Sequence, residues 1–157
     1  FAPKSRSMLQ RIQTIYLALA LLSQLAQFFL PWVEYYVNGT ETGVSALELD
    51  GSHFTVMPLT FVLSLSLGLV LGSIFGFKNR AKQMKTARMA LISTLLGFLA
   101  FAFIHYMNIQ ALDEMGELMM TYQLTTVLPL VSAILIWLAI KGIKKDDDLI
   151  RSVDRLR

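Results

Sequence analysis

Four long stretches without a charged residue constrain this chain more than any other feature of its sequence. They lie between Arg11 and Glu34, Asp50 and Lys78, Arg88 and Asp113, and Glu117 and Lys141. Each stretch is longer than the roughly 18–20 residues that a helix needs to cross a hydrocarbon core about 30 Å thick. The sequence therefore predicts an all-α membrane protein with four transmembrane helices, at about 14–33, 58–77, 89–109 and 124–141.

The basic residues indicate how these helices are oriented. All 14 Lys and Arg residues precede the first helix, occupy the connection between the second and third, or follow the fourth. Because basic residues concentrate on the cytoplasmic side of membrane proteins, we expect both termini to be cytoplasmic. The net charge of +3 then reflects topology and contact with anionic headgroups. We expect the lipid bilayer as a partner, and no nucleic acid.

Small residues recur at every fourth position of the second predicted helix. They are Ser64, Gly68, Gly72 and Gly76, in the stretch SLSLGLVLGSIFG. Helices in a bilayer associate largely through close packing, which small residues permit. The short basic connection makes the second and third helices antiparallel neighbours, so we expect these residues to pack against small residues of the third helix, Ser93 and Gly97 among them. The alternative is self-association or contact with another subunit.

Polar residues lie inside the first predicted helix, at Ser23, Gln24 and Gln27. Polar side chains at that depth usually face a helix bundle and form hydrogen bonds there, which gives them a structural role. The alternative is a polar ligand site between the first and third helices near the outer leaflet. Its candidate ligand-facing residues are Gln24, Gln27 and His105.

The two connections on the outer side differ in character. In the first, residues 34–57, Asp50-Gly51 separates the alternating segments ALEL and HFTV. Asp-Gly in this setting is typical of a β-hairpin, so we expect a small hairpin-like insert. The second connection carries apolar residues at helical spacing: Ile109, Leu112, Met115, Leu118 and Met119. It predicts either an extension of the third helix or a short amphipathic segment on the membrane.

The last segment, residues 146–157, predicts a short amphipathic cytoplasmic tail helix. Because such a helix is unstable alone in water, it must lie against headgroups, the protein's own cytoplasmic loop or a partner. The candidate partner-binding residues are Leu149, Ile150, Arg151, Val153, Asp154, Arg155 and Arg157. The arginines suit such a contact, since their planar group pairs with carboxylates through two parallel hydrogen bonds.

Several kinds of chemistry have no counterpart in this sequence. The predicted helices carry no Asp, Glu, Lys or Arg at mid-membrane depth, which removes the usual relay for ion-coupled transport. The chain has no cysteine, and its two histidines, His53 and His105, lie in the outer insert and near the outer end of the third helix. No nucleophile elbow or phosphate-binding loop occurs. We therefore expect no catalytic residue, no cofactor and no metal site.

Two segments resemble the start and end of a known family. They are MLQRIQTIYLALALL, from Met8 onward, and the terminal IRSVDRLR. Both are similar to the domain-of-unknown-function family 4293 of small inner-membrane proteins of Bacteroidota, and the resemblance covers Met8 to Arg157. It implies a multi-pass bacterial inner-membrane protein and carries no established activity. It also sets residues 1–7 apart as a leader- or tag-like segment before a four-helix domain at 8–145.

Two functional hypotheses follow. The first is a non-enzymatic accessory or structural subunit of a larger inner-membrane complex, because a small body without intramembrane charge carries a patterned tail on one side and an insert on the other. The second is a membrane protein that binds a small molecule or lipid, such as a quinone, near the outer leaflet. Under the first hypothesis, other subunits of the complex are the expected protein partners.

Overall fold

The computed structural model describes the backbone of residues 5–44 and 56–154, and the side chains of residues 12–41 and 56–153. The elements are α1 (Ser5–Phe29), β1 (Val33–Val37), β2 (Thr40–Val44), α2 (Met57–Phe75), α3 (Arg80–Asp113), β3 (Leu118–Tyr122) and α4 (Leu128–Asp154). Short 3-10 helices, Gly76–Lys78 and Leu124–Val127, follow α2 and precede α4. The α-helices of the described chain, four in number, are long and apolar enough to cross a membrane.

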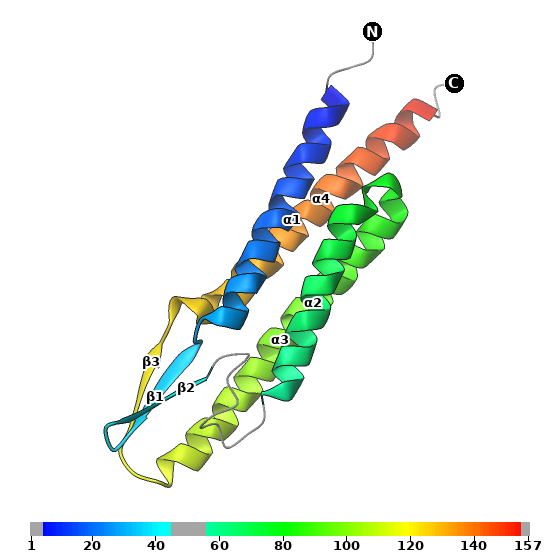
Figure 1. Cartoon of the computed structure of the whole chain (residues 1–157). Helices are drawn as coiled ribbons and strands as arrows, with labels where there is room; N and C mark the ends of the chain where they lie inside the picture. The colour runs from blue at the N-terminus through cyan, green and yellow to red at the C-terminus, as the bar shows by residue number, and fades with distance from the viewer. Residues whose placement is uncertain (1–4, 45–55, 155–157) are drawn as a thin grey trace.

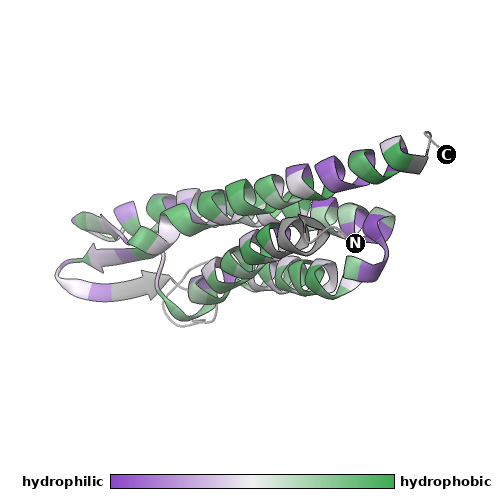
Figure 2. Ribbon diagram, turned by 90° about the horizontal axis from the view of Figure 1, so that it is seen from above, coloured by the Kyte–Doolittle hydropathy of each residue, from purple (hydrophilic) through white to green (hydrophobic). Residues whose placement is uncertain are grey.

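The helices form an elongated bundle with a small sheet at one end (Figure 1). α1 packs mainly against α4, α2 packs against α3, and α3 also contacts α4. The start of α1 and the end of α4 lie opposite the sheet, at the same end of the bundle as the turn between α2 and α3 (Figure 1). Hydrophilic residues gather at that turn and along the last part of α4, whereas hydrophobic residues dominate the middle of the helices (Figure 2). We call the two ends the basic end and the sheet end.

The first helix ends earlier than the sequence predicted. α1 stops at Phe29 instead of residue 33, and a strand begins at Val33. The cause is Pro31, which has no N–H to donate and disfavours the helical conformation at the residue before it. Trp32 then turns back onto the helix, and its indole Nε1 donates to the Gln27 carbonyl oxygen at 2.8 Å.

The last two helices are longer than predicted. α3 spans Arg80–Asp113 instead of 89–109, and its start is capped by Asn79, whose side chain accepts a hydrogen bond from the Lys82 N–H at 3.1 Å. Such a cap satisfies one of the free N–H groups at a helix start. α4 runs from Leu128 to Asp154 without a break, so the described part of the tail continues this helix.

β1 is the central strand of an antiparallel sheet with the order β2-β1-β3. A tight turn at Asn38 and Gly39 joins β1 to β2, and both residues have positive φ, 50° and 82°. Asn-Gly in this conformation is a preferred two-residue hairpin turn. The insert therefore contains a hairpin, but at an earlier position than expected. The predicted turn at Asp50-Gly51 lies outside the described residues.

The third strand comes from the other connection at this end. α3 extends to Asp113, which agrees with one of the two predictions for this segment, but β3 then pairs with β1 where no strand was expected. Asn38 fixes the turn before β3, because its N–H donates to the Glu117 carbonyl at 3.2 Å and its Nδ2 to the Met115 carbonyl at 3.3 Å. A β-carbon at Gly116 would collide with the Asn38 side chain, so this approach requires glycine. The fold is thus mostly helical with a three-stranded sheet.

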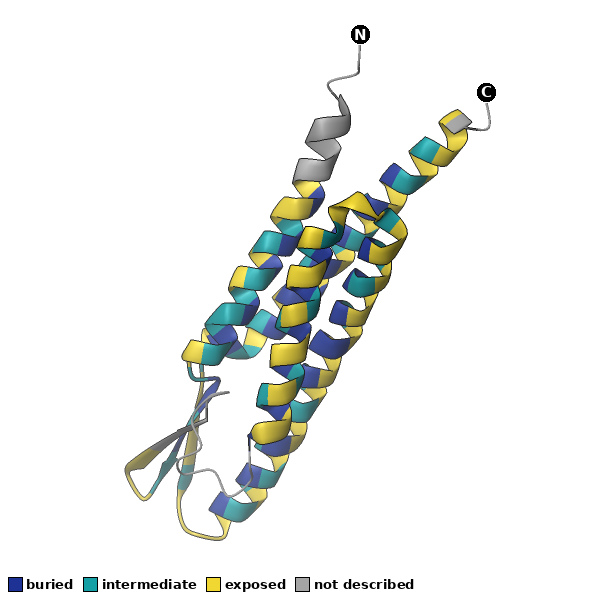
Figure 3. Ribbon diagram, turned by 45° about the vertical axis from the view of Figure 1, so that its right-hand side comes forward, coloured by how far each residue is buried: buried dark blue, intermediate teal, exposed yellow. Residues whose placement is uncertain are grey.

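Two clusters of buried apolar side chains fill the bundle. The cluster near the sheet consists of Trp32, Val33, Tyr35, Val56, Leu59, Leu63, Phe101, Ile104 and Leu112. The cluster nearer the basic end consists of Leu17, Ala20, Val70, Ala90, Ile136 and Ala139. The outward faces of the helices are exposed (Figure 3) and carry large apolar side chains, Phe61 and Leu99 among them. Helices that are apolar on all sides are typical of a membrane-embedded bundle.

Candidate functional site

Gln24 of α1 lies at the centre of a buried hydrogen-bond cluster that joins three helices. Its Nε2 donates to Ser66 Oγ of α2 at 2.8 Å and to Thr94 Oγ1 of α3 at 2.9 Å. The two hydroxyl oxygens lie 2.7 Å apart and are themselves hydrogen-bonded. All three side chains are completely buried. The cluster therefore ties α1 to the pair formed by α2 and α3.

Gln27 makes the equivalent connection to α4. Its Nε2 donates to Ser132 Oγ at 3.2 Å and to the Ser23 carbonyl at 3.1 Å. Ser132 in turn donates to Ser23 Oγ at 2.9 Å. The side-chain oxygens of Gln24 and Gln27 are buried without a hydrogen-bond partner among the described residues. These contacts support a structural role for both glutamines, and ligand binding by them and His105 stays a prediction.

His105 lies closer to the sheet, between two tyrosines. The Tyr35 hydroxyl is 2.5 Å from its Nδ1, and the Tyr122 hydroxyl is 3.0 Å from its Nε2. A neutral imidazole accepts at one nitrogen and donates at the other, so both hydrogen bonds can exist together. The Phe101 ring stacks on the imidazole with the centroids 5.8 Å apart. This cluster joins β1, α3 and β3.

Tyr35 and Asn108 add buried polar groups to the same place. Burial raises the pKa of the Tyr35 phenol above its ordinary value of 10.0, and the nearby Tyr122 raises this pKa further. The side chain of Asn108 lowers the pKa by a smaller amount. The phenol therefore stays protonated at physiological pH and remains a hydrogen-bond donor. Asn108 is almost completely buried, and its amide reaches no partner of good hydrogen-bond geometry within the described chain.

Metal ligands do not cluster in the part of the chain that the structure describes. No group of three or more His, Cys, Asp or Glu side chains that could hold a metal ion occurs there. His53, in the outer insert, lies outside the described residues. The contacts within the cluster of Tyr35, His105 and Tyr122 are hydrogen bonds between the two hydroxyl groups and the two imidazole nitrogens.

Half of the small-residue series on α2 lies away from α3, contrary to expectation. Ser64 and Gly68 are on the exposed side of the helix, and a β-carbon at Gly68 would meet nothing within 4 Å. Gly72 and Gly76 do approach α3, since β-carbons there would lie 3.5 Å from Thr86 Cγ2 and 3.7 Å from the Gln83 Cα. The reason is geometric. A four-residue repeat drifts around a helix that has 3.6 residues per turn, so one end of the series reaches α3 and the other does not.

The expected positions on α3 do contact α2. Ser93 donates its hydroxyl to the Val62 carbonyl at 3.1 Å. A β-carbon at Gly97 would lie 3.3 Å from a methyl carbon of Leu63, so the two helices are tightly packed here. The face of α2 that meets them carries larger and more polar residues than the glycine series: Leu59, Leu63, Ser66, Val70 and Ser73.

A groove with a volume of about 560 Å³ lies between the exposed side of α2 and the first turns of α3, and we call it the glycine groove. Its lining residues are Gly68, Leu69, Gly72, Phe75, Gly76, Lys78, Asn79, Lys82 and Thr86. Glycines thus form part of its floor, and two lysines lie toward the basic end. In the described chain, no other helix fills this groove.

A buried charged contact closes the basic end. Asp146 of α4 accepts a hydrogen bond from Gln13 Nε2 at 2.9 Å, and Arg80 Nη1 lies 3.9 Å from the same carboxylate oxygen. Gly142, one turn earlier in α4, allows this approach, because a β-carbon there would lie 2.7 Å from Gln13 Cγ. Three helices, α1, α3 and α4, therefore meet at one carboxylate.

The tail candidates are partly described. The apolar ones are exposed or half-buried on α4: Leu149, Ile150 and Val153. Arg151 Nε lies 2.9 Å from Asp147 Oδ2 within the same helix. The backbone of Asp154 ends α4, and Arg155 and Arg157 lie outside the described residues. Partner binding by this segment stays a prediction.

Several residues of these clusters were not predicted from the sequence. Ser66 carried a usable signal, because it is a polar residue inside an apolar span like Ser23. Asp146 stands in a run of three aspartates, and only its position one helical turn after Gly142 sets it apart. Tyr35 carried no local signal, since its partner His105 is distant in the sequence.

Comparison with known proteins assigns nearly the whole chain to one family. The family model described as Domain of unknown function (DUF4293) matches residues 9–156. A comparison with curated proteins found no match. The matched range includes the three strands and all but the first turn of the helical bundle.

Proposed function

The chain belongs to the DUF4293 family, whose description assigns no activity, and we propose from its exposed surfaces that it is a non-enzymatic accessory subunit of a larger complex. The observation that carries this proposal is the glycine groove, an uncovered row of small residues on a helix apolar enough to cross a membrane. A second helix, from another subunit of that complex, would occupy it.

The proposed location is the bacterial inner membrane, with the basic end in the cytoplasm. The distribution of lysine and arginine supports this orientation, because basic residues concentrate on the cytoplasmic side. Every basic residue of the α2–α3 turn and of α4 belongs to the basic end, while the strands and the α3–β3 connection carry acidic residues and no basic ones. The sheet then faces the outer side.

Packing in a bilayer supports helix docking at the glycine groove. Lipid tails are as apolar as leucine, so membrane helices associate through close contact, which small residues allow. Glycine is also among the poorest helix formers, about 1 kcal/mol less favourable than alanine in water. A helix surface that contacted only lipid would need no glycine and would carry larger apolar side chains, as it does at the exposed Phe61 and Leu65 of the same helix.

Substitution of Gly68 by leucine tests the docking. A β-carbon at Gly68 meets nothing within 4 Å in the chain itself, so Gly68→Leu fills the groove without a clash inside the subunit. The matched control is Ala102→Leu, which adds the same side chain at an exposed small residue of α3. Purification from native membranes in mild detergent, followed by mass spectrometry, identifies the proteins that accompany each variant.

We expect the wild-type chain and Ala102→Leu to recover the same membrane proteins in the same ratio. Gly68→Leu should recover at least about tenfold less of them, which corresponds to a loss of about 1.4 kcal/mol in association. Recovery of all three proteins as free monomers would overturn the proposal. So would equal recovery of partners by Gly68→Leu, or recovery of nothing but further copies of this chain.

A further inference from the structure

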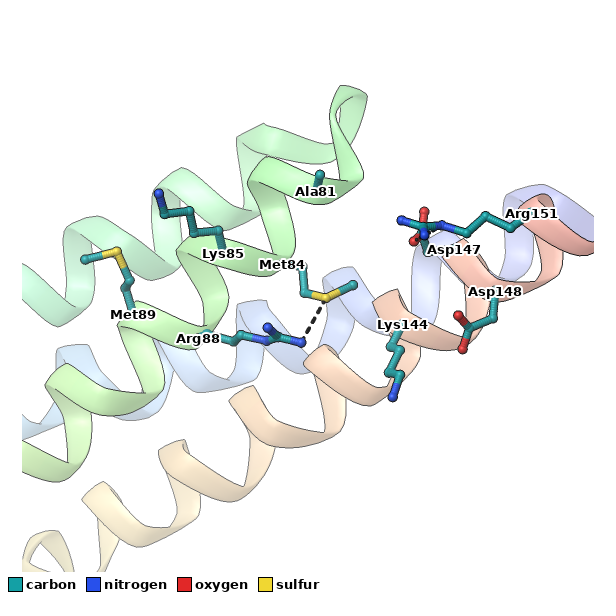
Figure 4. A pocket seen from close by; sticks show the side chains of 9 residues that line it. All are labelled: Ala81, Met84, Lys85, Arg88, Met89, Lys144, Asp147, Asp148 and Arg151. Carbon is teal, nitrogen blue, oxygen red and sulfur yellow. Dashed lines mark hydrogen bonds and ion pairs between the residues drawn. The ribbon is translucent and has the colours of Figure 1, made fainter.

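A second groove lies at the basic end, along the facing sides of α3 and α4 (Figure 4), and has a volume of about 550 Å³. Ala81, Met84 and Met89 supply its apolar lining. Its charged lining consists of four basic side chains and two acidic ones: Lys85, Arg88, Lys144, Arg151, Asp147 and Asp148. We call it the charged groove, and its excess of positive charge suits an anion.

Three of these cations have no carboxylate partner among the described residues. Arg151 is neutralised by Asp147 at 2.9 Å. Arg88 extends from α3 toward α4 and donates to Met84 Sδ at 3.3 Å, which is a weak acceptor (Figure 4). Within the described chain, no carboxylate oxygen lies within 4.0 Å of Lys85, Arg88 or Lys144. The groove therefore receives two unpaired positive charges from α3 and one from α4, and Arg88 is the one on α3 that extends toward α4.

The position of the charged groove along the bundle matches the headgroup region of a bilayer. The apolar stretch of α3 begins just after Arg88, and that of α4 ends just before Lys141. In the orientation proposed above, the groove therefore opens at the level of the cytoplasmic headgroups. Met84 and Met89 supply apolar surface for the part of a lipid next to its phosphate.

We propose that the charged groove binds the phosphate group of one anionic phospholipid of the cytoplasmic leaflet, between Arg88 and Lys144. A guanidinium group donates two parallel hydrogen bonds to phosphate, and an ammonium group adds a compact positive charge. Basic pockets between transmembrane helices on the cytoplasmic side are suited to such headgroups. The site rests on the proposed bilayer orientation and is independent of helix docking at the glycine groove.

The test distinguishes this site from a general attraction of the basic end for lipid. The groove variant combines Arg88→Gln with Lys144→Gln, and the control variant combines Lys82→Gln with Lys145→Gln. Each removes one positive charge from α3 and one from α4. Lys82 and Lys145 are exposed at the same end but do not line the charged groove. The purified full chain in detergent is titrated with phosphatidylglycerol, phosphatidylcholine of the same chain length, or inorganic phosphate, and bound lipid is counted by native mass spectrometry.

Both lipids carry the phosphate, but phosphatidylcholine also carries a choline cation, which the excess positive charge of the groove repels. We therefore expect one phosphatidylglycerol to bind the wild-type chain and the control variant at least about tenfold more tightly than phosphatidylcholine. The groove variant should lose this preference. Inorganic phosphate should not displace the lipid. The proposal is overturned if the wild type has no preference, if the control variant loses it equally, or if inorganic phosphate competes.

Thermal unfolding of both double variants shows whether they fold. All four substituted side chains are exposed, so each variant should unfold at nearly the wild-type temperature. Should the groove variant unfold early, the single substitutions Lys144→Gln and Lys145→Gln provide the same comparison on one helix. Lys144→Gln is expected to reduce the preference for phosphatidylglycerol and Lys145→Gln to leave it intact, and equal effects of the two would overturn the site.

Discussion

Gln24 fixes the position of α1 relative to two other helices through a single nitrogen. That nitrogen donates to hydroxyl groups of Ser66 and Thr94, on α2 and α3. Apolar side chains pack on either side of this level, but apolar contacts alone tolerate small rotations of a helix. Interhelical hydrogen bonds are directional and contribute modestly to stability in a membrane. The main contribution of Gln24 is therefore to the register and rotation of α1.

A double-mutant cycle measures the bond between Gln24 and Thr94. We expect the losses of unfolding free energy caused by Gln24→Leu and by Thr94→Val to be less than additive. The coupling energy should be about 0.6 kcal/mol and at most about 1.7 kcal/mol, which is the range for hydrogen bonds between membrane helices. The free energy of unfolding is measured by titration from mild detergent into dodecyl sulfate. The control cycle pairs Gln24→Leu with Thr86→Val, whose hydroxyl bonds within α3, to the Lys82 carbonyl. The stability effects of substitutions at distant sites add within about 0.5 kcal/mol. Equal coupling energies in the two cycles would therefore contradict a direct hydrogen bond between Gln24 and Thr94.

At the scale of elements, α1 and α4 pack closely where Gly142 faces Gln13. A β-carbon at Gly142 would lie 2.7 Å from Gln13 Cγ, so larger residues would force the two helices apart or displace that side chain. Gln13 then bonds to Asp146, and Arg80 of α3 lies beside the same carboxylate. One close helix contact thus holds a buried polar cluster that involves a third helix.

Substitution of Gly142 by valine should disrupt this contact. We expect Gly142→Val to lower the free energy of unfolding by about 1–3 kcal/mol, the usual cost of overpacking a well-packed contact. Gly68→Val is the matched control, since it places the same side chain in a helix where a β-carbon meets nothing within 4 Å. Unfolding in dodecyl sulfate compares the two with the wild-type chain. Equal destabilisation would mean that helix propensity, and not the contact with Gln13, explains the loss.

Over the whole molecule, features that depend on local composition were predictable from the sequence. The length of each charge-free stretch indicates an apolar helix long enough to cross a membrane. These stretches predicted the four long apolar helices of the described chain. The resemblance carried by the first and last segments was confirmed by the family match over residues 9–156. Asn38-Gly39 carried a local hairpin signal that was not used and forms the turn between β1 and β2, while the predicted turn at Asp50-Gly51 lies outside the described residues and stays a prediction.

Features that depend on distant pairs were not predictable. β3 pairs with β1 through contacts such as Val33 with Tyr122, and nothing local in either segment indicates its partner. The side of a helix that meets a neighbour is also a property of the assembled bundle. The spacing of the series indicated a smooth helix face, but it could not indicate that Gly72 and Gly76 approach α3 while Ser64 and Gly68 stay exposed.

The orientation of the whole molecule follows from one expectation about charge and can be measured directly. Because the chain contains no cysteine, a single introduced thiol reports its own side of the membrane without background. Thr40→Cys places it in an exposed position of the hairpin, and Ser152→Cys places it in an exposed position near the end of α4. In intact spheroplasts, a membrane-impermeant maleimide should label Thr40→Cys but not Ser152→Cys, since basic residues are retained in the cytoplasm. Ser152→Cys should become labelled only once the membrane is permeabilised. The opposite pattern would mean that the molecule is inverted, with the charged groove in the outer leaflet. Labelling of both thiols from outside would contradict a bundle that crosses the membrane with its two ends on opposite sides.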